Sequence, residues 1–195
     1  MPETRNLRLI PHRPQDLVAL LKETAEYEKS SGMPVADGIR EFLVAASPEF
    51  LAQVQTATVS DPWKFGFAIV HKIDNGAGGS RATSTGKPAR VDEPGGESIN
   101  LVIGMCGFTG PPDANGAVEL AYGIAPSYQG KGYATEAAAA LVGFASADPR
   151  VRIIRAHTLP ERNASTRVLE KCGFSKTGEI RDPENNLVWQ WEKVV

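Results

Sequence analysis

The sequence predicts an α+β fold built around a single mixed, mostly antiparallel sheet. Strand-like and helix-like segments alternate along the chain, three strand-like segments follow one another in its middle, and two more form a hairpin at its end. The chain has 195 residues, of which 42% are hydrophobic. This length and composition suit one domain over residues 1–195 with a sizeable core.

The first part of the chain reads as a short strand followed by helices. Residues 7–10 are strand-like, and Pro11 closes them. Asp16 suits the cap or first turn of a helix that runs to about Lys29, because apolar residues recur there at helical spacing. Two shorter helices are expected over residues 37–46 and 48–55.

The middle of the chain reads as two paired strands with a long insertion. Residues 63–71 are rich in aromatic and branched side chains, and residues 101–108 repeat this character, so both are expected to be strands. Residues 74–98 between them hold many Gly, Ser, Thr and Pro and few large apolar residues. Such a segment cannot bury enough surface to offset the ordering of the chain, so a mobile loop is predicted.

The last part of the chain alternates strands with helices. A helix over residues 135–147 follows a strand and a glycine-rich turn, and a second helix opens at Asn163 and ends at Cys172-Gly173. The strands expected here are 118–124, 151–158, 175–180 and 187–194.

Charge and composition argue against several classes of protein. The net charge of −2 gives no bulk attraction to nucleic acid or to an anionic membrane. The chain start lacks the layout of a secretory signal, and no apolar run approaches the roughly 20 residues that span a bilayer, so a cytoplasmic protein is expected. The two cysteines and three histidines show no metal-ligand spacing, so no metal site is expected.

The most informative segment is YGIAPSYQGKGYATE, residues 122–136. A strand leads into glycines, and these lead directly into a helix. Gly130 and Gly132 allow the backbone to curl with its amides inward, and the helix start at Thr135 adds unpaired N–H groups. Such a concavity favours a diphosphate, to which Lys131 adds charge from the rim.

Two common nucleotide motifs do not fit this segment. A Walker loop needs Ser or Thr after its Lys, but Gly132 follows Lys131, and Ala125 stands where the first Gly belongs. The dinucleotide fingerprint G-x-G-x-x-G fits Gly130 and Gly132, but Thr135 replaces the third Gly. Both readings fail on spacing.

The hexapeptide Gln129-Gly130-Lys131-Gly132-Tyr133-Ala134 resembles the acyl-CoA-binding signature Gln/Arg-x-x-Gly-x-Gly/Ala of the GNAT superfamily of N-acetyltransferases. Its context, VELAYGIAPSYQGKGYATEA, is similar to the central strand, loop and helix of that superfamily. The segment RNASTRVLEKCGF resembles a second CoA-side element in the branch of ribosomal-protein N-terminal acetyltransferases. The insertion at residues 74–98 departs from the usual short hairpin.

This resemblance implies a splayed central strand pair, flanked by helices, with pantetheine between residues 118–124 and 151–158. It implies acetyl-CoA as the donor and an amine as the acceptor. The backbone N–H of Ile124 is then expected near the thioester carbonyl. The other residues implied in acetyl-CoA binding are Gln129, Gly130, Lys131, Gly132, Tyr133, Ala134, Thr135 and Asn163, the last also as a helix cap.

Two residues are candidates for proton transfer. Glu119 is the candidate base, since strand alternation places it on the same small-residue face as Ala121 and Gly123; the alternative is a solvent-facing acid. Ser165 matches a serine of the family and is the candidate acid for the CoA thiolate; the alternative is a capping or first-turn serine of the helix that opens at Asn163. Many members use a tyrosine from this region, but no Tyr follows Tyr133.

The function expected from this reading is transfer of an acetyl group from acetyl-CoA to a primary amine by direct attack in a ternary complex. The acceptor is left open between a protein N-terminal amine and a small molecule. An acyl-CoA-binding sensor without turnover is the alternative. A homodimer is possible, because a mixed sheet leaves exposed edges.

Overall fold

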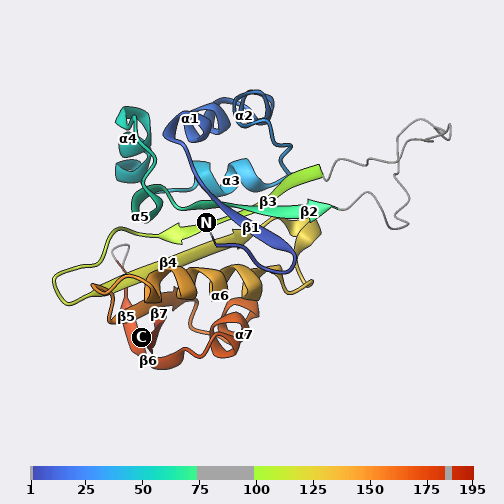
Figure 1. Ribbon diagram of the computed structural model, residues 1–195. Coiled ribbons are helices and arrows are strands. Elements are labelled where there is room, and N and C mark those ends of the chain that lie inside the picture. Colours follow the sequence, from blue (N-terminus) through green and yellow to red (C-terminus); the bar gives the residue numbers. More distant parts are fainter. Residues whose placement is uncertain (1, 74–98, 183–185) are drawn as a thin grey trace.

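The computed structural model describes residues 2–73, 99–182 and 186–195 (Figure 1). The insertion predicted over residues 74–98 therefore lies outside the described residues. Seven strands form one sheet in the order β1-β2-β3-β4-β5-β7-β6, and β4–β5 is its parallel pair. The α+β class and the mixed, mostly antiparallel sheet are confirmed. The strands are β1 Leu7–Pro11, β2 Phe67–Ile73, β3 Ile99–Phe108, β4 Ala117–Ile124, β5 Ile153–Thr158, β6 Ser175–Arg181 and β7 Leu187–Val194.

The parallel pair in the centre of the sheet is short. Ala117 to Glu119 of β4 pair with Ile153 to Arg155 of β5, but β4 runs on to Ile124 and β5 to Thr158. On its other edge, β4 stays paired with β3 as far as Ile124. The two strands therefore separate beyond Glu119, and the predicted splay is confirmed.

Helices cover both faces of this sheet (Figure 1). On one face, a buried cluster that includes Leu17, Ile39 and Val102 joins the sheet to the N-terminal helices. On the other, a cluster that includes Ile69 and Leu141 joins it to the C-terminal helices. The helices are α1 Pro14–Lys22, α2 Thr24–Ser31, α3 Ile39–Val44, α4 Pro48–Thr56 and α5 Pro62–Phe65 in the first part, then α6 Tyr133–Ser146 and α7 Ala164–Lys171.

The single helix predicted from Asp16 to Lys29 is wrong, because Glu23 is extended (φ −154°, ψ 151°) and divides it into α1 and α2. The buried carboxylate of Asp16 explains the break. Its Oδ1 accepts a hydrogen bond from the Ser30 hydroxyl at 2.7 Å, and Arg13 donates to both oxygens. In an unbroken helix, Asp16 and Ser30 would lie about 21 Å apart along the axis.

The strand predicted over residues 63–71 begins later than expected. Pro62–Phe65 forms the one-turn helix α5, in which Asp61 accepts a hydrogen bond from the Trp63 N–H at 3.0 Å. Gly66 then adopts a left-handed φ of 66°, and a Cβ there would lie 2.4 Å from the Cys106 carbonyl oxygen. This cap and this glycine delay β2 to Phe67.

His12, which follows β1, should make the protein sensitive to acid. It is 3% exposed, and burial lowers its pKa to about 4, although nearby Asp16 acts in the opposite direction. In the unfolded chain, His12 takes up a proton below about pH 6.5, whereas in the folded protein it does so only near pH 4. The proton therefore favours the unfolded chain, and the free energy of unfolding falls as pH falls. Between pH 7 and 4.5 we expect His12 to account for a loss of roughly 2–3 kcal/mol in the free energy of unfolding.

Urea unfolding of the wild type and of His12→Asn at both pH values measures this contribution. The variant should lose less free energy of unfolding than the wild type over the same interval. Equal losses in the two proteins would show that His12 does not cause the acid sensitivity.

Candidate active site

The glycine-rich turn after β4 leads into α6. A single 3₁₀ turn over Pro126–Tyr128 comes first, then Gly130 and Gly132 adopt left-handed φ values of 74° and 87°. Gly132 is the residue before the helix, so α6 begins at Tyr133, two residues earlier than predicted. The N–H groups of its first turn have no carbonyl partner within the helix, and they carry the positive end of the helix dipole.

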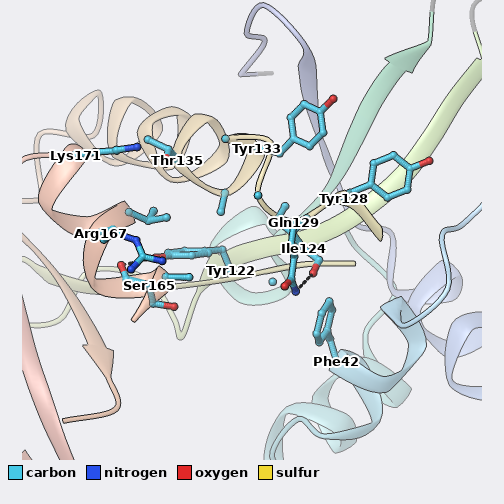
Figure 2. A pocket seen from close by; sticks show the side chains of 16 residues that line it. Phe42, Tyr122, Ile124, Tyr128, Gln129, Tyr133, Thr135, Ser165, Arg167 and Lys171 are labelled. Carbon is cyan, nitrogen blue, oxygen red and sulfur yellow. Dashed lines mark hydrogen bonds between the residues drawn. The ribbon is translucent and has the colours of Figure 1, made fainter. Parts of the chain in front are cut away.

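These N–H groups border a cavity of about 450 Å³, which we call the loop cavity (Figure 2). Residues of β4, of the glycine-rich turn, of α6 and of α7 line it, and Phe42 of α3 lies at its edge. Most of the predicted binding residues are among them. They are Ile124, Gln129, Gly130, Gly132, Tyr133, Ala134 and Thr135, together with Ser165.

The end of β4 presents polar backbone groups toward the splay. The bonds from Thr109 N to Glu119 O (2.9 Å) and from Ala125 N to Ile103 O (2.8 Å) fix which residues of β4 are bonded to β3. In an antiparallel pair, every second residue of a strand bonds to the neighbouring strand, so Glu119 and Ala125 point toward β3. Ile124 lies between these positions, and its N–H and C=O therefore point the other way, toward β5. Gln129 Nε2 donates to the Ile124 carbonyl at 2.9 Å (Figure 2), while the Ile124 side chain is buried.

Two predicted residues are not among those that line the loop cavity. Lys131 Nζ lies 4.9 Å from the centre of the Tyr128 ring. Asn163 caps α7: its Oδ1 accepts from Thr166 N at 3.1 Å, and Thr166 Oγ1 accepts from Asn163 N at 3.0 Å. The capping role of Asn163 is thus confirmed. Asn163 and Thr166 make the cap, and Ser165 lies in the first turn of α7, which agrees with the alternative of a capping or first-turn serine.

Sequence reasoning missed two basic residues of α7. Arg167 and Lys171 are exposed and line the loop cavity (Figure 2). Their spacing of four residues places them on one face of the helix, while Thr166 and Leu169 face the core. This spacing was the available signal. The cavity therefore has basic side chains opposite the start of α6.

Tyr122 spans the splay. Its side chain reaches from β4 to α7, where its hydroxyl donates to the Ser165 carbonyl at 3.4 Å (Figure 2). Burial raises the pKa of Tyr122 to about 12. The phenol therefore stays protonated at neutral pH and forms part of the cavity wall.

Glu119 lies on the opposite face of β4 from Tyr122. Glu119 is the last residue of β4 paired with β5, opposite Arg155. Its Oε1 accepts a hydrogen bond at 2.7 Å from Nδ1 of His157, two residues further along β5. Nε2 of His157 is buried and has no hydrogen-bond partner among the described residues. The Glu119 side chain is 37% exposed, so the carboxylate reaches solvent while it holds His157. Five residues of strand, about 16 Å, separate it from Ile124.

A second space of about 360 Å³, the aromatic pocket, lies on the other side of the central strand. It shares Phe42, Tyr122 and Gly123 with the loop cavity. The Phe42 ring lies directly over Gly123, because a Cβ built at that glycine would be 3.1 Å from it. The two spaces therefore meet at Phe42.

The part of the chain that the structure describes contains neither a metal-ligand cluster nor a membrane-spanning helix. No group of three or more His, Cys, Asp or Glu residues there could hold a metal ion. In residues 2–73, 99–182 and 186–195, no helix combines the length and apolar character needed to cross a bilayer.

The chain is similar to known acetyltransferases in sequence. The family described as acetyltransferase (GNAT) domain matches residues 6–175. An uncharacterized N-acetyltransferase p20 of Bacillus licheniformis is 35% identical over 83 residues, 43% of this chain and 47% of that protein. The match thus spans about half the length of that relative.

Two solved structures share the fold over almost the whole chain. A GNAT-family acetyltransferase from Bacillus anthracis has a TM-score of 0.56 at 18% identity, covering 98% of this chain and 96% of that one. RimL, a ribosomal L7/L12 alpha-N-protein acetyltransferase in complex with coenzyme A, has a TM-score of 0.59 at 15% identity, covering 100% and 97%. With the family match over residues 6–175, the chain belongs to the GNAT acetyltransferase domain family.

Proposed function

We propose that this protein transfers an acetyl group from acetyl-CoA to a primary amine, by direct attack of the amine in a ternary complex. The observation that carries the proposal is the turn Gly130–Thr135, whose free helix N–H groups border a cavity beside the splayed β4 and β5. A diphosphate suits such a turn, and an extended chain suits the gap between the strands. Coenzyme A has both parts, and the RimL structure contains it.

Different residues of this chain bind different parts of the donor. The N–H groups at the start of α6 face the diphosphate, and Arg167 and Lys171 supply positive charge from α7. Ile124, whose N–H points into the splay, donates to the thioester carbonyl oxygen, on which negative charge develops during attack. Gln129 holds the end of β4 in this position through the Ile124 carbonyl.

Proton transfer is assigned to groups on both sides of β4. Glu119, held by His157, accepts the proton of the attacking amine through water. Direct contact is excluded because Glu119 and Ile124 lie about 16 Å apart along β4. Ser165 lines the loop cavity and is the candidate donor to the departing thiolate. Tyr122 supports this part of α7 through the Ser165 carbonyl.

Calorimetric titration with acetyl-CoA and with free CoA, followed by thiol release with a panel of amines and N-terminal peptides, tests the proposal. Binding together with amine-dependent thiol release is the expected result. Binding without release from any amine would favour an acyl-CoA sensor. Failure of both acetyl-CoA and CoA to bind would overturn the assignment of the loop cavity.

Arg167→Gln and Lys171→Gln should each weaken CoA binding about tenfold at low salt, or about 1.4 kcal/mol, because each removes a charge facing the phosphates. Both variants should also show a weaker dependence of the dissociation constant on salt than the wild type. Arg162→Gln is the matched control, since Arg162 is an exposed arginine before α7 that pairs with Glu170 and is not among the cavity-lining residues. Calorimetry at two salt concentrations measures the effect; equal losses in all three variants would contradict a local role.

A further inference from the structure

We propose that the acceptor is a monoamine whose remaining body is apolar, and that this body occupies the aromatic pocket. The inference rests on the proposed acetyl transfer and narrows its acceptor. Its basis is the composition of the pocket and its junction with the loop cavity.

The pocket is placed where an acceptor has to lie. Its floor consists of Met105 and Gly107 of β3 with Ala121 and Gly123 of β4, which are paired neighbours on one face of the sheet. Phe42 lies over Gly123 and the Gly66 backbone over Gly107, whereas Ala121 is exposed, so the open part of the floor is at Ala121. At Phe42 it meets the loop cavity, and two positions along the same face of β4 lies Glu119.

The walls of the pocket are aromatic. Phe42 of α3, Phe50 of α4 and Phe65 of α5 line it, and the rings of Phe50 and Phe65 lie edge to face, 6.4 Å apart. Phe42 is 38% exposed, which is unusual for so large an apolar side chain in a domain with a full core. An apolar body in the pocket would cover these rings and gain the free energy of apolar burial.

The charges at the pocket disfavour a second cation. Its charged side chain is Lys64, whose Nζ lies 3.8 Å from Asp61 Oδ2 and which is half exposed. His12 also lines it and is uncharged at neutral pH, since burial lowers its pKa to about 4. No Asp or Glu occurs among the described residues that line the pocket. A polyamine would therefore place further positive charges against apolar rings and Lys64, with no carboxylate among the described lining residues to pair with them.

A matched pair of amines tests this inference. Hexylamine and 1,6-diaminohexane have the same chain length and differ by the second amine. NMR titration of the CoA-saturated protein measures the dissociation constant of each, and thiol release measures kcat/KM. We expect hexylamine to bind at least about tenfold more tightly and to react at least about tenfold faster. Phe-Ala-Ala-amide against Lys-Ala-Ala-amide repeats the comparison for peptide N-termini and distinguishes a peptide acceptor from a small amine.

A gain-of-function variant sharpens the test. Ala46 lines the pocket and is half-buried, so Ala46→Glu adds a carboxylate there. It should shift the ratio of the two dissociation constants about tenfold in favour of 1,6-diaminohexane. Ala52→Glu, at an exposed position of α4 that is not among the lining residues, should change neither.

Binding and thiol release together distinguish failure of the pocket inference from failure of the proposed acetyl transfer. Equal or tighter binding of the diamine by the wild type, or no hexylamine binding up to its solubility limit, would overturn the inference. An unchanged preference in Ala46→Glu would overturn the placement of the body in the aromatic pocket. Selective binding of hexylamine without thiol release would support this pocket chemistry and overturn acetyl transfer.

Discussion

Gly132→Val should weaken acetyl-CoA binding by at least about 100-fold, or about 2.7 kcal/mol, while the protein remains folded. Gly132 has a φ of 87°, which a β-branched residue adopts only at a cost, so the turn is expected to relax and move the first N–H groups of α6. A Cβ built at Gly132 meets no protein atom within 4 Å. The valine therefore fits sterically in the free protein and interferes at the cavity that Gly132 lines.

Gly32→Val is the matched control for this variant. Gly32, at the end of α2, has a φ of 73°, and a Cβ there also meets no atom within 4 Å. Both variants should lose a similar free energy of unfolding, about 1–2 kcal/mol, but only Gly132→Val should lose acetyl-CoA binding. Calorimetry and urea unfolding of both proteins check this. Wild-type affinity in a folded Gly132→Val variant would remove the turn from the binding site.

The glycine-rich turn could be predicted because its conformation is local. Gly130 and Gly132 lie two residues apart between a strand and a helix, and the left-handed φ values that they need are a property of glycine itself. The break between α1 and α2 could not be predicted in this way. It depends on the contact of Asp16 with Ser30, fourteen residues later, which exists only after the chain has turned back.

The candidate site shows the same division. The residues of the loop cavity come largely from one continuous segment, so one motif revealed them. The aromatic pocket combines Phe42, Phe50, Phe65 and Met105 from four separate elements, and their common position follows from tertiary packing. The Glu119–His157 pair likewise depends on the register of β4 with β5, which hydrophobic periodicity leaves undetermined.

Glu119→Gln should lower kcat about 100-fold, within the range observed for loss of a general base, with little change in acetyl-CoA affinity. The affinity should hold because Glu119 is not among the residues that line the loop cavity. His157→Asn should lower kcat about tenfold, since His157 acts by orienting the carboxylate through the 2.7 Å bond to Nδ1. Steady-state thiol release and calorimetry together measure both effects.

A matched carboxylate on the same part of the sheet provides the control. Glu192 of β7 pairs with Arg155 of β5 at 2.8 Å and is half-buried, so Glu192→Gln removes a comparable ion pair close to the splay. We expect that variant to keep wild-type kcat. Formate should partly restore the rate of Glu119→Ala, because a small carboxylate can accept the amine proton in place of the missing side chain. A Glu119→Gln variant with the kcat of Glu192→Gln, or a Glu119→Ala variant indifferent to formate, would show that the pair stabilises the start of the splay and does not transfer the proton.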